Sequence, residues 1–251
     1  MTSKIESDPL RVGVVGSGRL GKALASALRQ AGMEVDGPAG RGEVPRGDAI
    51  LLCVPDAEIA TAARTVAGAA EFVGHTSGAT PLAVLEPASA QAFGLHPLQT
   101  FAEGAGPEDF RGAGCAVAGA TPEALELANS LARSLGMEPF EIDDDGRAAY
   151  HAAASIASNF LVTLQHAAEQ VAAAAGLEPE QARALLAPLV EQTARNWAAL
   201  GPERALTGPV ARGDDDTVEA QRRAIARATP HLVPLFDELV ERTRDLAKVP
   251  A

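Results

Sequence analysis

The chain is most constrained by a glycine-rich turn close to its start. Residues 11–32 read RVGVVGSGRLGKALASALRQAG, so a strand-like apolar run leads into a GSGRLG motif and an alanine-rich helical pattern. At such a junction Gly16 permits a tight turn, Gly18 lets the backbone approach a pyrophosphate, and Gly21 allows helix and strand to pack closely. The helix N-terminus adds free N–H groups and a positive dipole end. We therefore expect a dinucleotide-binding loop made of Gly16, Ser17, Gly18, Arg19, Leu20 and Gly21.

Strand-like and helical segments alternate through the first half of the chain. Apolar runs predict strands at 12–16, 49–54, 72–75, 91–96 and 115–118, with weaker ones at 33–36 and 137–142. Helical patterns lie at 19–31, 57–67, 80–85 and 122–135. Short runs buried on both faces and separated by helices are typical of an α/β protein with a doubly wound, mainly parallel sheet, the Rossmann fold.

The second half has an all-α pattern. An acidic turn at 143–146 offers an N-cap, and helical periodicity then continues to Gly176 without a proline. Further helices are expected at 179–200, 217–227 and 231–248, with a glycine- and proline-broken loop at 205–216. We predict an NAD(P)-binding domain at 1–143 and an all-α substrate or dimerisation domain at 144–251.

Composition excludes several classes of protein. The 251 residues carry a net charge of −12, which argues against nucleic-acid binding through a basic face. No apolar stretch is long enough for a membrane span, and the polar start lacks a signal-peptide core, so we expect a cytoplasmic protein without a membrane partner. Cys53 and Cys115 fall in predicted strands, which favours reduced thiols, and no metal site is expected.

The identity of the dinucleotide depends on the second strand. Asp36 lies at the expected strand end, where an acid would bind the ribose 2′-OH of NAD. Arg41 follows closely and Arg19 sits in the glycine loop, and a pair of arginines suits the 2′-phosphate of NADP. NADP is favoured and NAD stays open. Val54 and Pro55, after the third strand, are expected to pass along the cofactor.

Two later strand ends carry polar side chains. The segments VGHTSGAT and FGLHPLQTF contain Ser77 and His96, either of which could contact nicotinamide or substrate or bond only to local backbone. His75 is still inside its strand, and for it the structural interpretation is favoured, namely hydrogen bonding to local backbone only.

A polar stripe follows on the long predicted helix. At 100° per residue it contains His151, Ser155, Ser158, Val162 and His166, with Asn159 at its border. It predicts either a ligand wall or a polar seam between packed helices. In the first case His151 is the proton donor, Ser155 and Asn159 bind the substrate carbonyl or carboxylate, and Ser158 also binds the substrate. Arg212, in the loop at 205–216, could bind a substrate carboxylate or simply lie in a helix connection.

Six motifs together carry a resemblance to a known family: GSGRLGKAL, LLCVPD, HTSG, GLHPLQTF, YHAAASIASNFL and LTGPVARGD. They resemble Rossmann-like proteins with a small uncharacterised helical C-terminal domain, similar in layout to ketopantoate reductase, pyrroline-5-carboxylate reductase and 6-phosphogluconate dehydrogenase-like enzymes. The resemblance implies an NAD(P) domain, a helical domain that often forms homodimers, and hydride transfer. Some members look like an alternative ketopantoate reductase of pantothenate synthesis.

One departure from these enzymes concerns the proton donor. Standard ketopantoate reductases and β-hydroxyacid dehydrogenases use a lysine, followed four residues later by asparagine, on the first long helix of the second domain. The lysines of this chain, Lys4, Lys22 and Lys248, cannot occupy that place. If a carbonyl is reduced, the acid must be His151 or His96.

These observations predict an NADP-dependent oxidoreductase acting on a small 2-oxo acid, with ketopantoate as the leading substrate. A cyclic imine acid, as in pyrroline-5-carboxylate reductase, is the second choice. A non-catalytic NAD(P)-binding sensor or scaffold is the rival from another class, because it would not need the missing lysine. A deazaflavin-type reductant is a third option.

Overall fold

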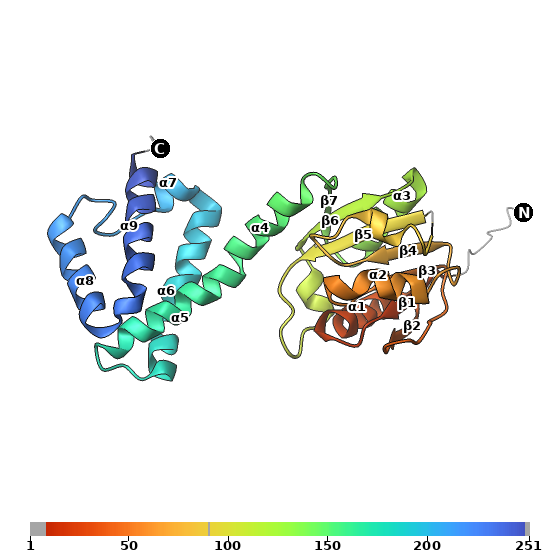
Figure 1. Cartoon of the computed structure of the whole chain (residues 1–251), viewed down its shortest axis with the longest axis horizontal. Helices are drawn as coiled ribbons and strands as arrows, with labels where there is room; N and C mark the ends of the chain where they lie inside the picture. The colour runs from red at the N-terminus through yellow and green to blue at the C-terminus, as the bar shows by residue number, and fades with distance from the viewer. Residues whose placement is uncertain (1–8, 90, 249–251) are drawn as a thin grey trace, which may run out of the picture. The chain divides into compact units, whose positions relative to one another are not determined.

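A computed structural model describes residues 9–89 and 91–248; Lys4 and the polar start lie outside the described residues. The chain divides into two compact units, Met1–Ser158 and Asn159–Ala251. The first contains a sheet covered by helices, and the second is helical (Figure 1).

Within the described residues, seven strands form one sheet in the order β2-β1-β3-β4-β5-β6-β7. The first five strands in this order are parallel, β6 is antiparallel to β5, and β7 is parallel to β6. This confirms the predicted mainly parallel α/β sheet. The strands are β1 Arg11–Val15, β2 Glu34–Ala39, β3 Ala49–Leu52, β4 Phe72–His75, β5 Gln91–Leu98, β6 Gly114–Gly119 and β7 Glu138–Glu141.

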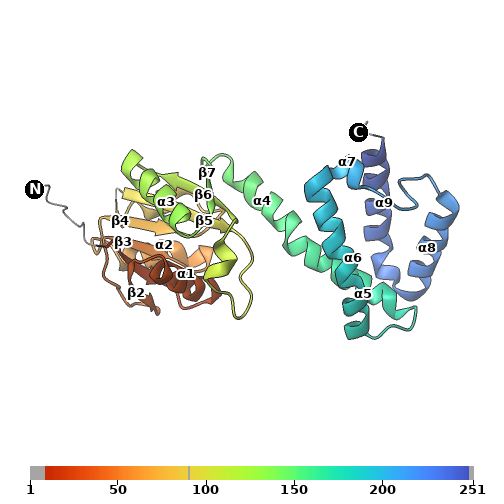
Figure 2. The same cartoon turned by 180° about the vertical axis from the view of Figure 1, so that it is seen from behind.

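Helices cover both faces of the sheet because the central strands are apolar on both sides. The helices α1 (Arg19–Gln30) and α3 (Pro122–Ser134) pack on one face through a core that includes Leu24, Phe93 and Leu131. The helix α2 (Asp56–Thr65) and the 3₁₀ turn η1 (Leu82–Leu85) pack on the other (Figures 1 and 2). The short 3₁₀ turn η2 (Pro107–Phe110) precedes β6.

The glycine loop joins β1 to α1 through two backbone contacts that leave no room for a side chain. Gly16 has φ +110°, and a Cβ there would lie 2.2 Å from the carbonyl oxygen of Cys53. A Cβ on Gly21 would lie 1.9 Å from the carbonyl oxygen of Gly16. Both glycines are therefore required by the fold itself, as the sequence motif predicts.

One helix, α4 (Arg147–Ala157), belongs to the first unit and follows β7. The second unit consists of α5 Asn159–Ala173, α6 Pro179–Leu200, α7 Pro202–Ala205, α8 Asp215–Ala228, the 3₁₀ turn η3 Pro230–Leu232 and α9 Val233–Ala247. Ion pairs cross between its helices: Arg222 contacts Asp237 through two hydrogen bonds of 2.8 and 2.9 Å, and Arg183 contacts Glu169 at 2.8 Å. None of the described helices combines the length and apolar character that crossing a bilayer requires.

Three sequence expectations differ from the structure. The single helix expected from 146 to 176 is interrupted at Ser158, where φ and ψ are −119° and −71°, so the stripe is split between α4 and α5. The helix expected at 80–85 is only the 3₁₀ turn η1, because Pro81 restricts its start. The two compact units divide after Ser158, whereas the sequence places the boundary at 143–146, so α4 is grouped with the sheet.

Candidate functional site

The first candidate element is the N-terminal end of α1. Its N-cap, Gly18, supplies no side-chain cap, and no acidic residue stands in the first turn. The first N–H groups of any helix lack partners within the helix, so they are free to bind an anion here. A Cβ on Gly18 would meet no protein atom within 4 Å, so open space borders the backbone at this point. The loop fits the diphosphate of a dinucleotide.

A cavity of about 240 Å³ adjoins this loop. It is lined by Gly16 to Gly18, by the segment after β2 that includes Arg41, by Val54 and Pro55 after β3, and by one face of α2. Gly16, Ser17, Gly18, Arg41, Val54 and Pro55, all expected from sequence to hold the cofactor, are thus brought together. The side chain of Arg41 is 83% exposed, and its guanidinium pairs with Glu58 at 2.6 Å.

Asp36 does not occupy the position that the sequence predicts. The strand β2 continues past it to Ala39, and its carboxylate accepts a hydrogen bond of 2.7 Å from the backbone N–H of Arg46. Gly37 and Pro38 have the composition of a turn, which misplaces the strand end, but here they lie within the strand. The residues that follow β2 at the cavity are Gly40 and Arg41.

The second candidate element is a cluster of aromatic and imidazole rings where the first turns of α4 meet β5. The Nδ1 atom of His96 lies 2.6 Å from the Tyr150 hydroxyl, and the His96 and His151 ring centroids are 6.1 Å apart. A Cβ on Gly78 would lie 3.0 Å from both His96 Nε2 and His151 Nδ1, so glycine is what allows both rings to close on this loop. The two histidines proposed from sequence as acids are neighbours.

A buried guanidinium adjoins the ring cluster. Arg147 is only 3% exposed, and its Nε donates to Asp144 at 2.6 Å. Its Nη2 lies 3.3 Å from where a Cβ of Gly94 would be. Among the described residues, the buried side-chain polar atoms without a hydrogen-bond partner are this Nη2, His75 Nε2 and His151 Nδ1. Unpartnered polar atoms gathered in one place are uncommon in a structural core and typical of a functional site.

Burial sets the protonation states of the cluster. It lowers the pKa of His96 to about 4, with further lowering by His151 and Arg147 and a partial opposing effect of Asp56. Burial raises the pKa of Tyr150 to about 12. At pH 7 His96 is therefore neutral and Tyr150 protonated. His96 cannot be the imidazolium acid that the sequence allows, although a neutral imidazole can still donate a hydrogen bond to a polarised carbonyl.

Local contacts account for His75 and Ser77. His75 is fully buried and its Nδ1 accepts a hydrogen bond of 3.2 Å from the N–H of Ser77, in keeping with the structural interpretation. The Ser77 hydroxyl oxygen accepts from the N–H groups of Ala79 and Thr80 at 3.2 and 3.0 Å. The structure therefore uses Ser77 to shape the turn that carries Gly78.

The remaining candidates make no contact with the ring cluster among the described residues. Ser155 is half-buried on α4, and Ser158 stands at the helix break. Asn159 and Arg212 belong to the second unit, where Arg212 is exposed in the turn before α8. Asp214 caps that helix by accepting a hydrogen bond of 3.2 Å from the N–H of Thr217. Sequence reasoning missed Tyr150, Gly78 and Arg147, although Tyr150 stands directly before His151 in the motif YHAAAS.

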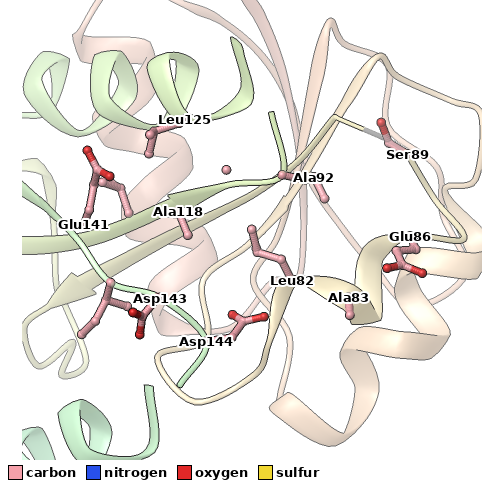
Figure 3. Close-up of a pocket in the computed structure, with 14 residues that line it drawn as sticks. Leu82, Ala83, Glu86, Ser89, Ala92, Ala118, Leu125, Glu141, Asp143 and Asp144 are labelled. Carbon is pink, nitrogen blue, oxygen red and sulfur yellow. The ribbon is translucent and has the colours of Figure 1, made fainter. Parts of the chain in front are cut away.

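A larger cavity, of about 840 Å³, lies at the amino-terminal end of β5 and the carboxyl ends of β6 and β7. Figure 3 shows its acidic side chains, among them Glu86, Glu141 and Asp144, around an apolar floor that includes Leu82 and Ala118. No basic side chain lines it among the described residues. A cavity of this charge repels an anionic ligand, so size does not make it the substrate site of a 2-oxo acid.

A doubly wound sheet with a glycine-rich first turn and a following helical unit defines a Rossmann-like two-domain protein. The chain belongs to the family described as Domain of unknown function (DUF2520), whose model matches residues 113–243, slightly more than half of the chain. This agrees with the resemblance drawn from the sequence motifs. No curated protein matches the chain significantly.

Several solved structures share the fold. A Bacteroides fragilis protein provisionally named an NADP oxidoreductase is 21% identical, over 94% of this chain and 98% of its own, with a TM-score of 0.80. A Thermotoga maritima protein is 25% identical over the same shares, with a TM-score of 0.75. The Plasmodium falciparum pyrroline carboxylate reductase, solved with NADP bound, is 12% identical over 95% of this chain and 98% of its own, at 0.62.

The buried ring of His75 predicts a specific loss of stability in acid. Burial, followed by the charge of Arg147, lowers the pKa of His75 to about 4. A histidine whose pKa is lowered by folding adds to the free energy of unfolding in full above about pH 6.5. This contribution, about 3 kcal/mol for one buried ring, is lost as the pH falls from about 6.5 to about 4.

Chemical denaturation at pH 7 and pH 4.5 tests this. In His75→Asn, whose amide oxygen can still accept from Ser77, the difference in unfolding free energy between the two pH values should shrink. The surface variant His231→Gln should keep the full difference. An unchanged difference in His75→Asn would refute the assignment of a buried neutral ring.

Proposed function

We propose that the protein is an NADP-dependent reductase that transfers a hydride to a small 2-oxo acid. The observation that carries the proposal is the arrangement along one edge of the sheet. The glycine loop follows β1. The loop that contains Gly78 follows β4, and His96 lies near the end of β5; both of these strands run parallel to β1. In open α/β sheets, ligands bind outside the carboxyl ends of the strands, where the strand order reverses, here between β1 and β3.

The distances suit a dinucleotide that extends along this edge. Neighbouring strands lie about 4.8 Å apart, so β1 and β5, three steps apart in the sheet, are separated by about 14 Å. A pyrophosphate on the amides of Gly18 to Gly21 would leave the nicotinamide end within reach of the ring cluster. When bound, NADPH would supply the hydride; this chain supplies the diphosphate cradle and the proton.

The ring cluster favours a carbonyl over an iminium substrate. A carbonyl oxygen accepts hydrogen bonds and gains negative charge during reduction, and a neutral His96, with Arg147 buried nearby, matches that change. An iminium is itself a cationic donor and gains nothing from these groups. His151 is the candidate proton donor to the forming alkoxide, and Arg212 stays the candidate for the carboxylate. Ketopantoate is the leading 2-oxo acid.

Preference for NADP over NAD rests on the segment after β2. The carboxylate of Asp36 already accepts a hydrogen bond from the backbone N–H of Arg46. Arg41 borders the cavity, and its guanidinium can leave the exposed carboxylate of Glu58 to bind a phosphate. Solved structures of similar fold include a pyrroline carboxylate reductase with NADP bound and a reductive aminase in complex with NADPH. Parallel calorimetric titrations with NADPH and NADH test the preference.

Two glycines of one loop provide a matched test of cofactor binding. Gly18→Ala should keep the melting temperature, because its methyl meets no protein atom, but should weaken NADPH binding at least tenfold by filling the diphosphate position. Gly21→Ala should instead destabilise the fold by about 3 kcal/mol, because its methyl collides with backbone. Equal NADPH affinity in Gly18→Ala and the unsubstituted protein would count against the cradle.

Turnover separates the reductase from a sensor. NADPH oxidation with ketopantoate should fall at least a hundredfold in His151→Ala, while the dissociation constant of NADPH stays unchanged. His231→Ala, on the surface of the helical unit, is the control and should keep full activity. Turnover of pyrroline-5-carboxylate in place of ketopantoate would select the imine reductase. Tight NADPH binding without turnover of either compound would select the sensor.

The helical unit is the proposed homodimer surface. Apolar side chains stand exposed on α5 and α6, including Val162 at 69%, Leu189 at 63% and Trp197 at 60%. Large apolar side chains exposed together on two neighbouring helices are uncommon on a monomer, and a second copy of the chain is the proposed occupant. Light scattering should give twice the chain mass, and Val162→Glu with Leu189→Glu should give the monomer mass. A monomeric unsubstituted protein would exclude this proposal.

A further inference from the structure

Tyr150 holds a position that no motif assigned. It comes from the first turns of α4 and lies half-buried between two aromatic neighbours, with its ring 5.8 Å from that of Phe140 and 5.5 Å from that of His96. Its hydroxyl reaches His96 Nδ1 at 2.6 Å, a short distance for a neutral pair. The contact joins the helix after β7 to the end of β5, two elements that are far apart in sequence.

The direction of this hydrogen bond follows from the chemistry of its partners. A phenol is a better donor than acceptor, and the unprotonated nitrogen of an imidazole is a strong acceptor. The opposite direction would require the phenol proton to find another acceptor, and no second partner of the Tyr150 hydroxyl exists among the described residues. The hydroxyl therefore donates to Nδ1. Because the ring is neutral, its single proton must then be on Nε2.

We propose that Tyr150 is a positioning residue that fixes His96 in the tautomer with its proton on Nε2. That nitrogen lies on the side of the ring facing Gly78, within 3.0 Å of the point where a Cβ would be, and has no partner among the described contacts. Nε2 is also absent from the buried unpartnered atoms, so it is reachable from outside. The hydrogen bond from Tyr150 therefore makes Nε2 of His96 a hydrogen-bond donor that points toward Gly78.

The surroundings of His96 support a fixed neutral donor. His151 faces it from α4, Arg147 adds positive charge from the same helix, and Asp56 at the start of α2 partly offsets them. Burial, followed by His151 and Arg147, lowers the pKa of His96 and so disfavours a second proton on the ring. With protonation disfavoured, the tautomer rather than the charge decides which nitrogen of the ring donates. Among the described residues, Tyr150 is the hydrogen-bond partner of Nδ1, the nitrogen that decides the tautomer.

Nitrogen NMR of the full chain tests this without any substrate. Long-range proton–nitrogen spectra of protein labelled with ¹⁵N-histidine distinguish the two tautomers, and the signals that vanish in His96→Asn assign His96 among five histidines. The unsubstituted protein should show His96 with its proton on Nε2. Tyr150→Phe should give a mixture of tautomers. A proton on Nδ1 in the unsubstituted protein, or an unchanged spectrum in Tyr150→Phe, overturns the proposal.

Phe140→Leu is the matched control. It removes the other aromatic neighbour of Tyr150, at a residue 38% exposed, and leaves the phenol in place. The His96 tautomer should stay as in the unsubstituted protein; a mixture of tautomers in this variant would mean that packing, not the hydroxyl, holds the ring. Should Tyr150→Phe not fold, the spectrum of the unsubstituted protein still decides between the tautomers.

The catalytic consequence rests on the proposed function and is measured separately. In Tyr150→Phe, kcat should fall about tenfold, because only part of the His96 population presents Nε2–H, while the dissociation constant of NADPH and KM change little. An equal loss in kcat and NADPH affinity would indicate a merely structural role. Absence of turnover in the unsubstituted protein would end the reductase proposal and leave the NMR result standing.

Discussion

The helix that follows the sheet is held over β5 by a guanidinium that almost no solvent reaches. Arg147 can be buried because Gly94 leaves room against the strand and Asp144 supplies the opposite charge three residues earlier. Burying a charge without a partner is strongly unfavourable, so the ion pair with Asp144 must be kept wherever Arg147 is buried. This requirement fixes the position of the start of α4. Tyr150 and His151, one turn further along, are thereby delivered to the ring of His96.

The candidate site thus combines two different kinds of preorganisation. After β1 the backbone itself forms the site: two glycines allow contacts that any side chain would prevent, and the first amides of α1 face open space. At β4 and β5 side chains form the site: burial keeps His96 neutral, and the phenol of Tyr150 is hydrogen-bonded to its ring. We propose that the first binds the cofactor and the second carries the proton chemistry; both elements lie along one sheet edge.

Most of the sheet and its helices could be predicted from periodicity. Strand β4 and helix α6 begin and end at the expected residues, because apolar runs and proline or glycine boundaries are local signals. The helix break at Ser158 could not be predicted, since no proline or glycine marks it. Asp36 was misplaced for the opposite reason: Gly37 and Pro38 have turn composition, yet the pairing of β2 with β1 keeps them in a strand.

The sequence by itself determined the dinucleotide-type loop, the mainly parallel α/β sheet and the candidacy of His96 and His151. These follow from residue types at fixed short spacings, which act through backbone sterics and hydrogen-bonding capacity. Only the tertiary structure decided that the two histidines meet, that Tyr150 bonds to one of them, and that Arg147 is buried beside them. Fifty-four residues separate His96 from Tyr150, and no local pattern encodes a contact or a desolvation that arises when the start of α4 meets β5.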